Sequence, residues 1–191
     1  MLILASASPR RQQILQDMGI AFCTVPSQYR EDNRRKMDPK ALVMMQAAGK
    51  AREVWERTEG KYPVLGADTL VVLDGSILGK PRDREDALRM LHALSGRTHQ
   101  VMTGVALMTG RGMKQTVCAT EVGFRKLSEQ EIRDYVDSGE PMDKAGAYGI
   151  QGGARRFAET VRGELSNVIG LPRKAVLSML KEEGGLLPCR S

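Results

Sequence analysis

The stretch "YPVLGADTLVVLDGSILGKP", residues 62–81, constrains the fold more than any other segment. Two apolar runs flank the dipeptide Asp74-Gly75, a preferred turn of two-residue β-hairpins, so the pattern predicts a hairpin. Asp68 lies inside the first run, where a carboxylate is costly to bury unless it binds a metal or takes part in chemistry. The alternative is a strand-end aspartate that caps a turn.

The N-terminal segment "LILASASPRR" predicts a buried strand at residues 2–5 followed by a helix. Ser8 is the expected N-cap and Pro9 the first helical residue. Arg10 and Arg11 then fall in the first turn, where the helix dipole disfavours cations by roughly 0.3–1 kcal/mol each.

An anionic ligand would offset this repulsion, because a helix N-terminus after a strand binds anions readily. The hydroxyls of Ser6 and Ser8 add further donors. The alternative is that both arginines are solvated on a surface helix.

Apolar periodicity and turn residues predict the remaining elements. Further strands are expected at 21–26, 97–109, 114–125 and 156–162, and helices at 9–19, 39–58, 83–94, 127–139 and 172–182. Residues 27–39 lack apolar periodicity and predict a loop. In the helix at 39–58, the positions at helical spacing are Leu42, Met45, Ala48, Gly49 and Arg52. The mixed order predicts one α/β domain, residues 1–191, built on a mixed, twisted sheet.

Composition narrows the function classes. The formal net charge is +6, which favours a polyanionic partner, but aromatic residues make up only 4%. Base-stacking platforms are therefore scarce, and small phosphorylated ligands fit better than nucleic acid. No apolar run approaches the length of a membrane span, and no signal peptide is recognised, so a cytoplasmic protein is expected.

The cysteines and histidines argue against a disulfide framework, a structural zinc site and a serine–histidine hydrolase. Cys23, Cys118 and Cys189 are widely spaced and odd in number, which argues against a disulfide framework and a structural zinc site. His92 and His99 are the only histidines, and no nucleophile-elbow motif accompanies them. We expect both to be structural or exposed.

Two lysines and a glycine-rich stretch complete the candidate residues. Lys50 lies in the predicted helix and Lys80 just past the hairpin; each alone would be interpreted as a solvated lysine. The stretch "DKAGAYGIQGGARRF", residues 143–157, holds four glycines that let the backbone approach a ligand closely, with Gln151 among its polar groups. Alone, it would be interpreted as a structural turn.

Together these segments resemble the Maf family of nucleoside triphosphate pyrophosphatases. The matching pieces, in family order, are "LASASPRR", "GADTLVVLDGSILGKP", "LHALSGRTHQVMTGVAL", "EVGFRKLSEQEI", "GEPMDKAGAYGIQG" and "SNVIGLP". The resemblance implies an elongated α/β fold with a cleft, related to inosine triphosphate pyrophosphatases. It also implies hydrolysis of a nucleoside triphosphate to the monophosphate and pyrophosphate, dependent on a divalent cation (Mg²⁺ or Mn²⁺). A homodimer is a further family expectation.

The resemblance also assigns site residues. The family residues that this sequence retains are Ser6, Ser8, Arg11, Glu31, Lys50, Asp68 and Lys80. The family often shows an Asp-Glu pair where this chain reads "YREDN"; Glu31 is the best match and Asp32 competes. We expect the serines, Arg11 and the two lysines to bind phosphate. Asp68 and Glu31 are expected to bind the metal, with Asp68 also the base that activates water.

Three positions separate the family's subgroups. The group that hydrolyses dTTP and UTP carries Arg, Thr and Gln where the 7-methyl-GTP group carries Trp, Gln and Glu. This chain has Arg10, Thr69 and Gln151, which predicts dTTP and UTP as substrates, with modified pyrimidine nucleotides a further option. The alternatives are a nucleotide-binding regulator of cell division without essential turnover, and a basic RNA-binding protein.

Overall fold

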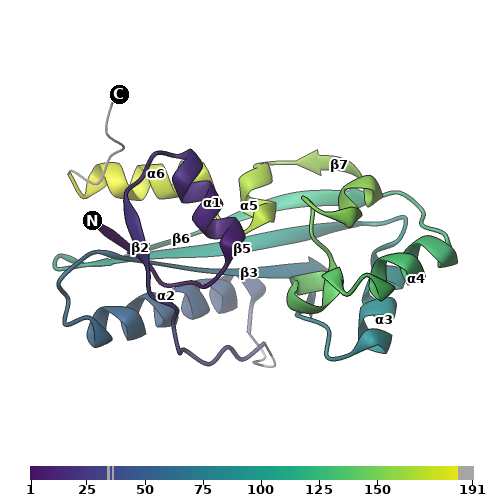
Figure 1. The fold of residues 1–191 in the computed structure, drawn as a ribbon, viewed down its shortest axis with the longest axis horizontal. Coiled ribbons are helices and arrows are strands. Elements are labelled where there is room, and N and C mark those ends of the chain that lie inside the picture. Colours follow the sequence, from purple (N-terminus) through teal and green to yellow (C-terminus); the bar gives the residue numbers. More distant parts are fainter. Residues whose placement is uncertain (34, 36, 185–191) are drawn as a thin grey trace. The chain divides into compact units, whose positions relative to one another are not determined.

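The computed structural model describes residues 1–33, 35 and 37–184, within which seven strands form one sheet (Figure 1). Its order is β2-β1-β3-β5-β6-β7, and β4 pairs with β3 outside this path. β1 is parallel to β2 and β3, whereas β4 is antiparallel to β3 and β7 to β6. The predicted mixed α/β sheet is therefore confirmed. The strands are β1 (Leu2–Leu4), β2 (Phe22–Thr24), β3 (Val64–Leu73), β4 (Ser76–Leu78), β5 (Thr98–Thr109), β6 (Gly112–Phe124) and β7 (Ala158–Arg162).

The helices fall close to their predicted positions, with one addition. The α-helices are α1 (Pro9–Asp17), α2 (Pro39–Arg57), α3 (Arg84–Leu94), α4 (Glu129–Asp137), α5 (Leu165–Ile169) and α6 (Arg173–Glu182). The short helix α5 and three 3₁₀ turns between residues 140 and 157 were not predicted. Among the described residues, no helix combines the length and the apolar character needed to cross a membrane.

The chain divides into two compact units. The first contains residues 1–68, 103–118 and the described residues from 170 onward, and the second contains residues 69–102 and 119–169. The expectation of a single domain stays a prediction.

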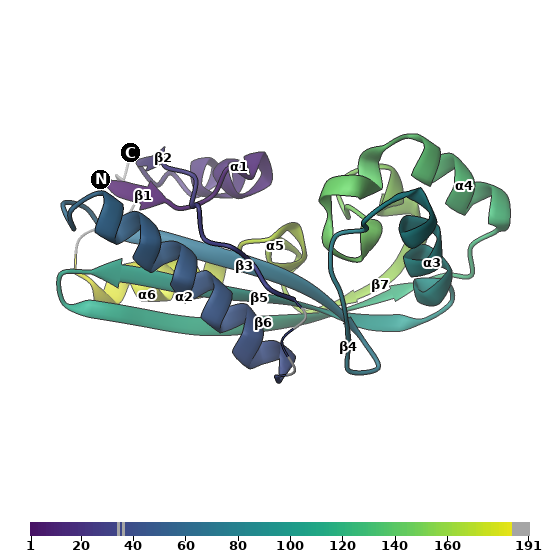
Figure 2. The ribbon, with the colours of Figure 1, turned by 90° about the horizontal axis from the view of Figure 1, so that it is seen from below.

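In the first unit, α2 and α6 lie on opposite faces of the sheet (Figures 1 and 2). Two glycines let α2 approach the strands closely. A Cβ on Gly66 would lie 2.4 Å from the carbonyl oxygen of Ala47, and one on Gly104 would lie 2.4 Å from that of Val43. Because both contacts are with backbone atoms, no side-chain rotation could relieve them. These glycines therefore fix how α2 packs.

The buried face of α2 differs from the spacing picked out in the sequence. Leu42 is buried, but Met45, Ala48 and Gly49 are only partly buried and Arg52 is exposed. The inward residues are instead Leu42, Val43, Gln46, Ala47, Lys50, Ala51 and Val54. Two members of this inward face, Gln46 and Lys50, are polar, and apolar periodicity does not detect polar residues that point inward.

In the second unit, His99 is part of an aromatic cluster. Its ring makes edge-to-face contacts with Phe124 and Tyr148, and its Nε2 lies 2.7 Å from the Tyr148 hydroxyl. His99 is 2% exposed, so burial lowers its pKa to about 4. His92 is an exposed partner of Glu129 at 3.2 Å. The prediction that both histidines are structural or exposed is confirmed.

Local signals were confirmed to different degrees. α4, which lies within the helix predicted at 127–139, carries a capping box of Ser128 and Glu131. Ser8 occupies the N-cap position of α1, but its side chain makes no capping hydrogen bond; its backbone N–H donates to Ser6 Oγ instead. Cys23 and Cys118 are partly buried, and Cys189 lies outside the described residues.

Candidate active site

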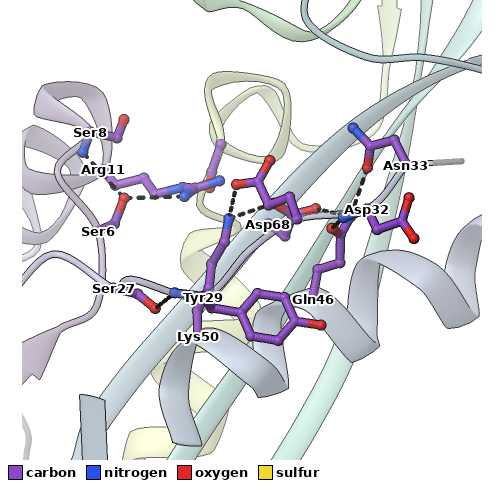
Figure 3. Close-up of polar contacts among 12 residues, drawn as sticks. Ser6, Ser8, Arg11, Ser27, Tyr29, Asp32, Asn33, Gln46, Lys50 and Asp68 are labelled. Carbon is purple, nitrogen blue, oxygen red and sulfur yellow. Dashed lines mark hydrogen bonds and ion pairs between the residues drawn. The ribbon is translucent and has the colours of Figure 1, made fainter. Parts of the chain in front are cut away.

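A partly buried ion cluster in the first unit joins three of the predicted residues (Figure 3). Lys50 Nζ lies 2.6 Å from Glu31 Oε1 and 2.6 Å from Asp68 Oδ1. Lys50 is 8% exposed and Asp68 4% exposed. One ammonium thus bridges two carboxylates, the kind of compensation that a buried charge requires.

The elements explain why these groups meet. Asp68 belongs to β3 and Lys50 to the inward face of α2, which Gly66 allows to pack against β3 at backbone distance. Glu31 lies in the segment between β2 and α2. Of the competing acidic pair, Glu31 reaches Lys50, whereas Asp32 lies 3.6 Å from Arg35.

Gln46 is a member of this cluster that the sequence analysis missed. Its Nε2 donates to Asp68 Oδ2 at 3.1 Å and to Asn33 Oδ1 at 2.9 Å, and its Oε1 accepts from the Asp32 N–H at 2.9 Å. It is completely buried. A glutamine inside an apolar helix face was the available signal, because burying an amide is costly unless it is hydrogen-bonded.

The predicted anion site is built around Arg11. Its Nε donates to the Gly170 carbonyl at 2.8 Å and its Nη1 to Ser6 Oγ at 3.2 Å. Burial lowers the pKa of Arg11, while the negative charges of Asp68 and Glu31 oppose that shift. Arg11 therefore lies within electrostatic reach of the ion cluster. Figure 3 shows Ser6 and Arg11 on one side of Lys50 and Asp68, and Gln46 and Asp32 on the other.

The remaining predicted residues have these positions. Arg10 is partly buried in the first turn of α1. Thr69, Lys80 and Gln151 belong to the second unit. Thr69 follows Asp68 in β3 and is partly buried, whereas Lys80 and Gln151 are exposed. Their predicted roles stay predictions.

The glycine-rich stretch packs against protein groups. A Cβ on Gly152 would lie 2.0 Å from Glu140 Oε1, and one on Gly146 would lie 2.8 Å from the Val71 side chain. Gly153 N–H donates to Glu140 Oε2 at 3.0 Å. In this unit Gly149, Gly152 and Gly153 thus pack around Glu140 and Gly146 packs against Val71, which agrees with the structural alternative weighed for them.

The ion cluster fits a divalent cation that is shared with substrate. Glu31 and Asp68 already converge on one cation, the ammonium of Lys50, and carboxylate oxygens are the ligands that Mg²⁺ prefers. Among the described residues, no group of three or more His, Cys, Asp or Glu side chains is placed to hold a metal alone. Mg²⁺ is usually bound by one or two carboxylates together with substrate phosphates, and this donor set matches that pattern.

Fold and site together define an α/β protein with a partly buried carboxylate–lysine–carboxylate cluster beside an arginine at a helix N-terminus. The family model described as Maf-like protein matches residues 1–183. The chain belongs to this family, as its motifs predicted.

Curated relatives match over nearly the whole chain and are named dTTP/UTP pyrophosphatase. The one from Citrifermentans bemidjiense is 45% identical over 187 residues, covering 97% of this chain and 96% of the relative. That from Symbiobacterium thermophilum is 49% identical over 185 residues (96% and 94%), and that from Escherichia coli O157:H7 is 44% identical over 185 residues (97% and 94%).

Among solved structures, the chain is similar to a nucleoside-triphosphatase, dITP/XTP pyrophosphatase, from Mycobacterium abscessus. The TM-score is 0.47 at 15% identity, covering 98% of this chain and 97% of that one. The Staphylococcus aureus Ham1 protein gives a TM-score of 0.47 at 12% identity, covering 95% and 98%.

Proposed function

We propose that the protein is a nucleoside triphosphate pyrophosphatase that hydrolyses dTTP and UTP to the monophosphate and pyrophosphate. The observation that carries this proposal is the cluster of Glu31 with the buried Lys50 and Asp68, which has Arg11 in electrostatic reach. The names of its relatives support the same activity. A cytoplasmic nucleotide-pool role and a homodimeric assembly belong to this proposal.

Each residue of the cluster has a chemical task. Asp68 accepts the proton of the attacking water, and Lys50 and Arg11 offset the negative charge of the triphosphate. Glu31 and Asp68 would hold a divalent cation, which would supply Lewis acidity at the α-phosphoryl group when bound. Positioning and charge stabilisation supply most of the rate, as is usual for phosphoryl transfer.

Three residues are proposed to select the base. The Gln151 amide accepts from N3–H and donates to O4 of uracil or thymine, and Arg10 donates to a carbonyl oxygen. Thr69 completes the set that the resemblance assigns. Cytosine carries an amino group where uracil and thymine carry O4, and purines are larger, so both are expected to be poorer substrates.

The test is pyrophosphate release from dTTP, UTP, CTP, ATP and GTP, with Mg²⁺, with Mn²⁺ and after chelation. We expect fast release from dTTP and UTP, slow release from CTP, little from the purines, and none with chelator. Binding of nucleotide without turnover under every metal condition would instead support the regulator alternative.

A further inference from the structure

One face of α2 holds the segment of residues 27–33 at three successive levels. Glu53 accepts from Ser27 Oγ at 2.7 Å and from the Gln28 N–H at 2.9 Å. At Gly49 the helix has no side chain, and a Cβ there would lie 2.2 Å from the Tyr29 ring. Gln46 forms the third level. Positions 46, 49 and 53 follow helical spacing, so they share one face.

The third level differs from the other two because it also reaches β3. The single amide of Gln46 accepts the Asp32 N–H, donates to Asn33, and donates to Asp68 Oδ2. Only a neutral amide offers an acceptor and two donors at once. A glutamate would face the Asp68 carboxylate without a proton to donate, and a leucine would make none of the three bonds.

These bonds fix both carboxylates of the ion cluster. The two oxygens of Asp68 have different partners, Lys50 on Oδ1 and Gln46 on Oδ2, which sets the plane of the carboxylate. In the sequence, Glu31 lies between Tyr29, whose ring packs on Gly49, and Asp32, whose N–H donates to Gln46. Its side chain is 36% exposed, so packing alone does not hold it in place.

We propose that Gln46 is a positioning residue that locks the Glu31 segment to Asp68 and so prepares the divalent-cation site. This inference rests on the proposed function for the identity of the cation, but not for the anchoring itself. Residues that orient metal ligands typically change metal affinity 10–100-fold when mutated.

The test compares Gln46→Leu and Gln46→Glu with the wild type, and uses Gln130→Leu, an exposed glutamine in α4, as the matched control. Mn²⁺ affinity is measured by titration with and without a non-hydrolysable UTP analogue, and exchange of the Asp32 amide proton by NMR. We expect both Gln46 variants to bind Mn²⁺ at least about 10-fold more weakly than the wild type. The Asp32 amide proton should also exchange faster in both. In UTP hydrolysis, the Mn²⁺ concentration for half-maximal rate should rise while KM for the metal–nucleotide complex changes less. Gln130→Leu should match the wild type.

A second variant tests the contact between the Tyr29 ring and Gly49, which also holds this segment on α2. Gly49→Ala displaces the Tyr29 ring and leaves the Gln46 amide intact, while alanine favours the helix. It should also weaken Mn²⁺ binding. If Gln46→Leu does not fold, this variant still tests whether the position of the segment affects Mn²⁺ affinity. Unchanged Mn²⁺ affinity or unchanged Asp32 exchange in folded Gln46 variants would overturn the role of Gln46. If the wild type with the UTP analogue binds no more Mn²⁺ than the free analogue does, the proposed metal centre itself is overturned.

Discussion

Asp68 is a buried carboxylate whose two oxygens are separately compensated, by an ammonium and by an amide. Its place in an apolar strand allowed Asp68 to be predicted as a functional residue, because burying an uncompensated charge there would cost too much free energy. Lys50 was found through the resemblance to a family. Gln46 was not found, since its importance comes from three partners that are remote in sequence or belong to an irregular segment.

Base selection is predicted to depend on Arg10, Thr69 and Gln151. The triple variant Arg10→Trp, Thr69→Gln and Gln151→Glu should lower kcat/KM for UTP by roughly 100-fold and gain activity on 7-methyl-GTP. The physical reason is that a carboxylate at 151 cannot donate to O4 of the pyrimidine. Steady-state kinetics on both nucleotides measure the change.

The control for this variant is Gln130→Glu, an exposed substitution in α4 that should leave selectivity unaltered. A triple variant that still hydrolyses UTP at the wild-type rate would remove these residues from base recognition. So would a wild-type enzyme that prefers 7-methyl-GTP.

At the scale of elements, strong local signals predicted most of the fold. The Asp74-Gly75 turn has both residues at positive φ, as the hairpin requires, and the capping box of α4 is present. Helix α5 and the 3₁₀ turns were missed because they are short and depend on tertiary contacts. One example is Asn167 Nδ2, which donates to the Val101 carbonyl at 2.9 Å.

Packing of α2 on the sheet gives a prediction for Gly66. Gly66→Ala should destabilise the protein by about 1–3 kcal/mol, because its Cβ would meet the backbone of Ala47 and Ala51. Urea unfolding measures the change. Gly110→Ala is the matched control, since its Cβ would meet nothing within 4 Å. Equal midpoints for the two variants would refute the packing role of Gly66.

For the whole molecule, His99 makes stability depend on pH. Its pKa is about 4 when folded, below its usual value of 6.5, because burial disfavours the charged form. Between those values the unfolded chain binds more protons, so stability is full above pH 6.5 and falls as the pH decreases toward 4.

The expected slope from this single group is at most about 1.4 kcal/mol per pH unit. Urea unfolding between pH 5 and 7 should show it in the wild type and in His92→Ala, and it should be smaller in His99→Gln. A slope that survives in His99→Gln would show that other groups cause it.

The most direct test of the central claim is the rate at which Asp68→Asn releases pyrophosphate from UTP. The control is Asp86→Asn, which changes another buried carboxylate, one paired with Arg89 in α3. We predict that Asp68→Asn folds but loses at least about 1,000-fold in kcat, since it removes both the base and a metal ligand. Asp86→Asn should keep a kcat near that of the wild type. Near-wild-type turnover by a folded Asp68→Asn protein would contradict the account.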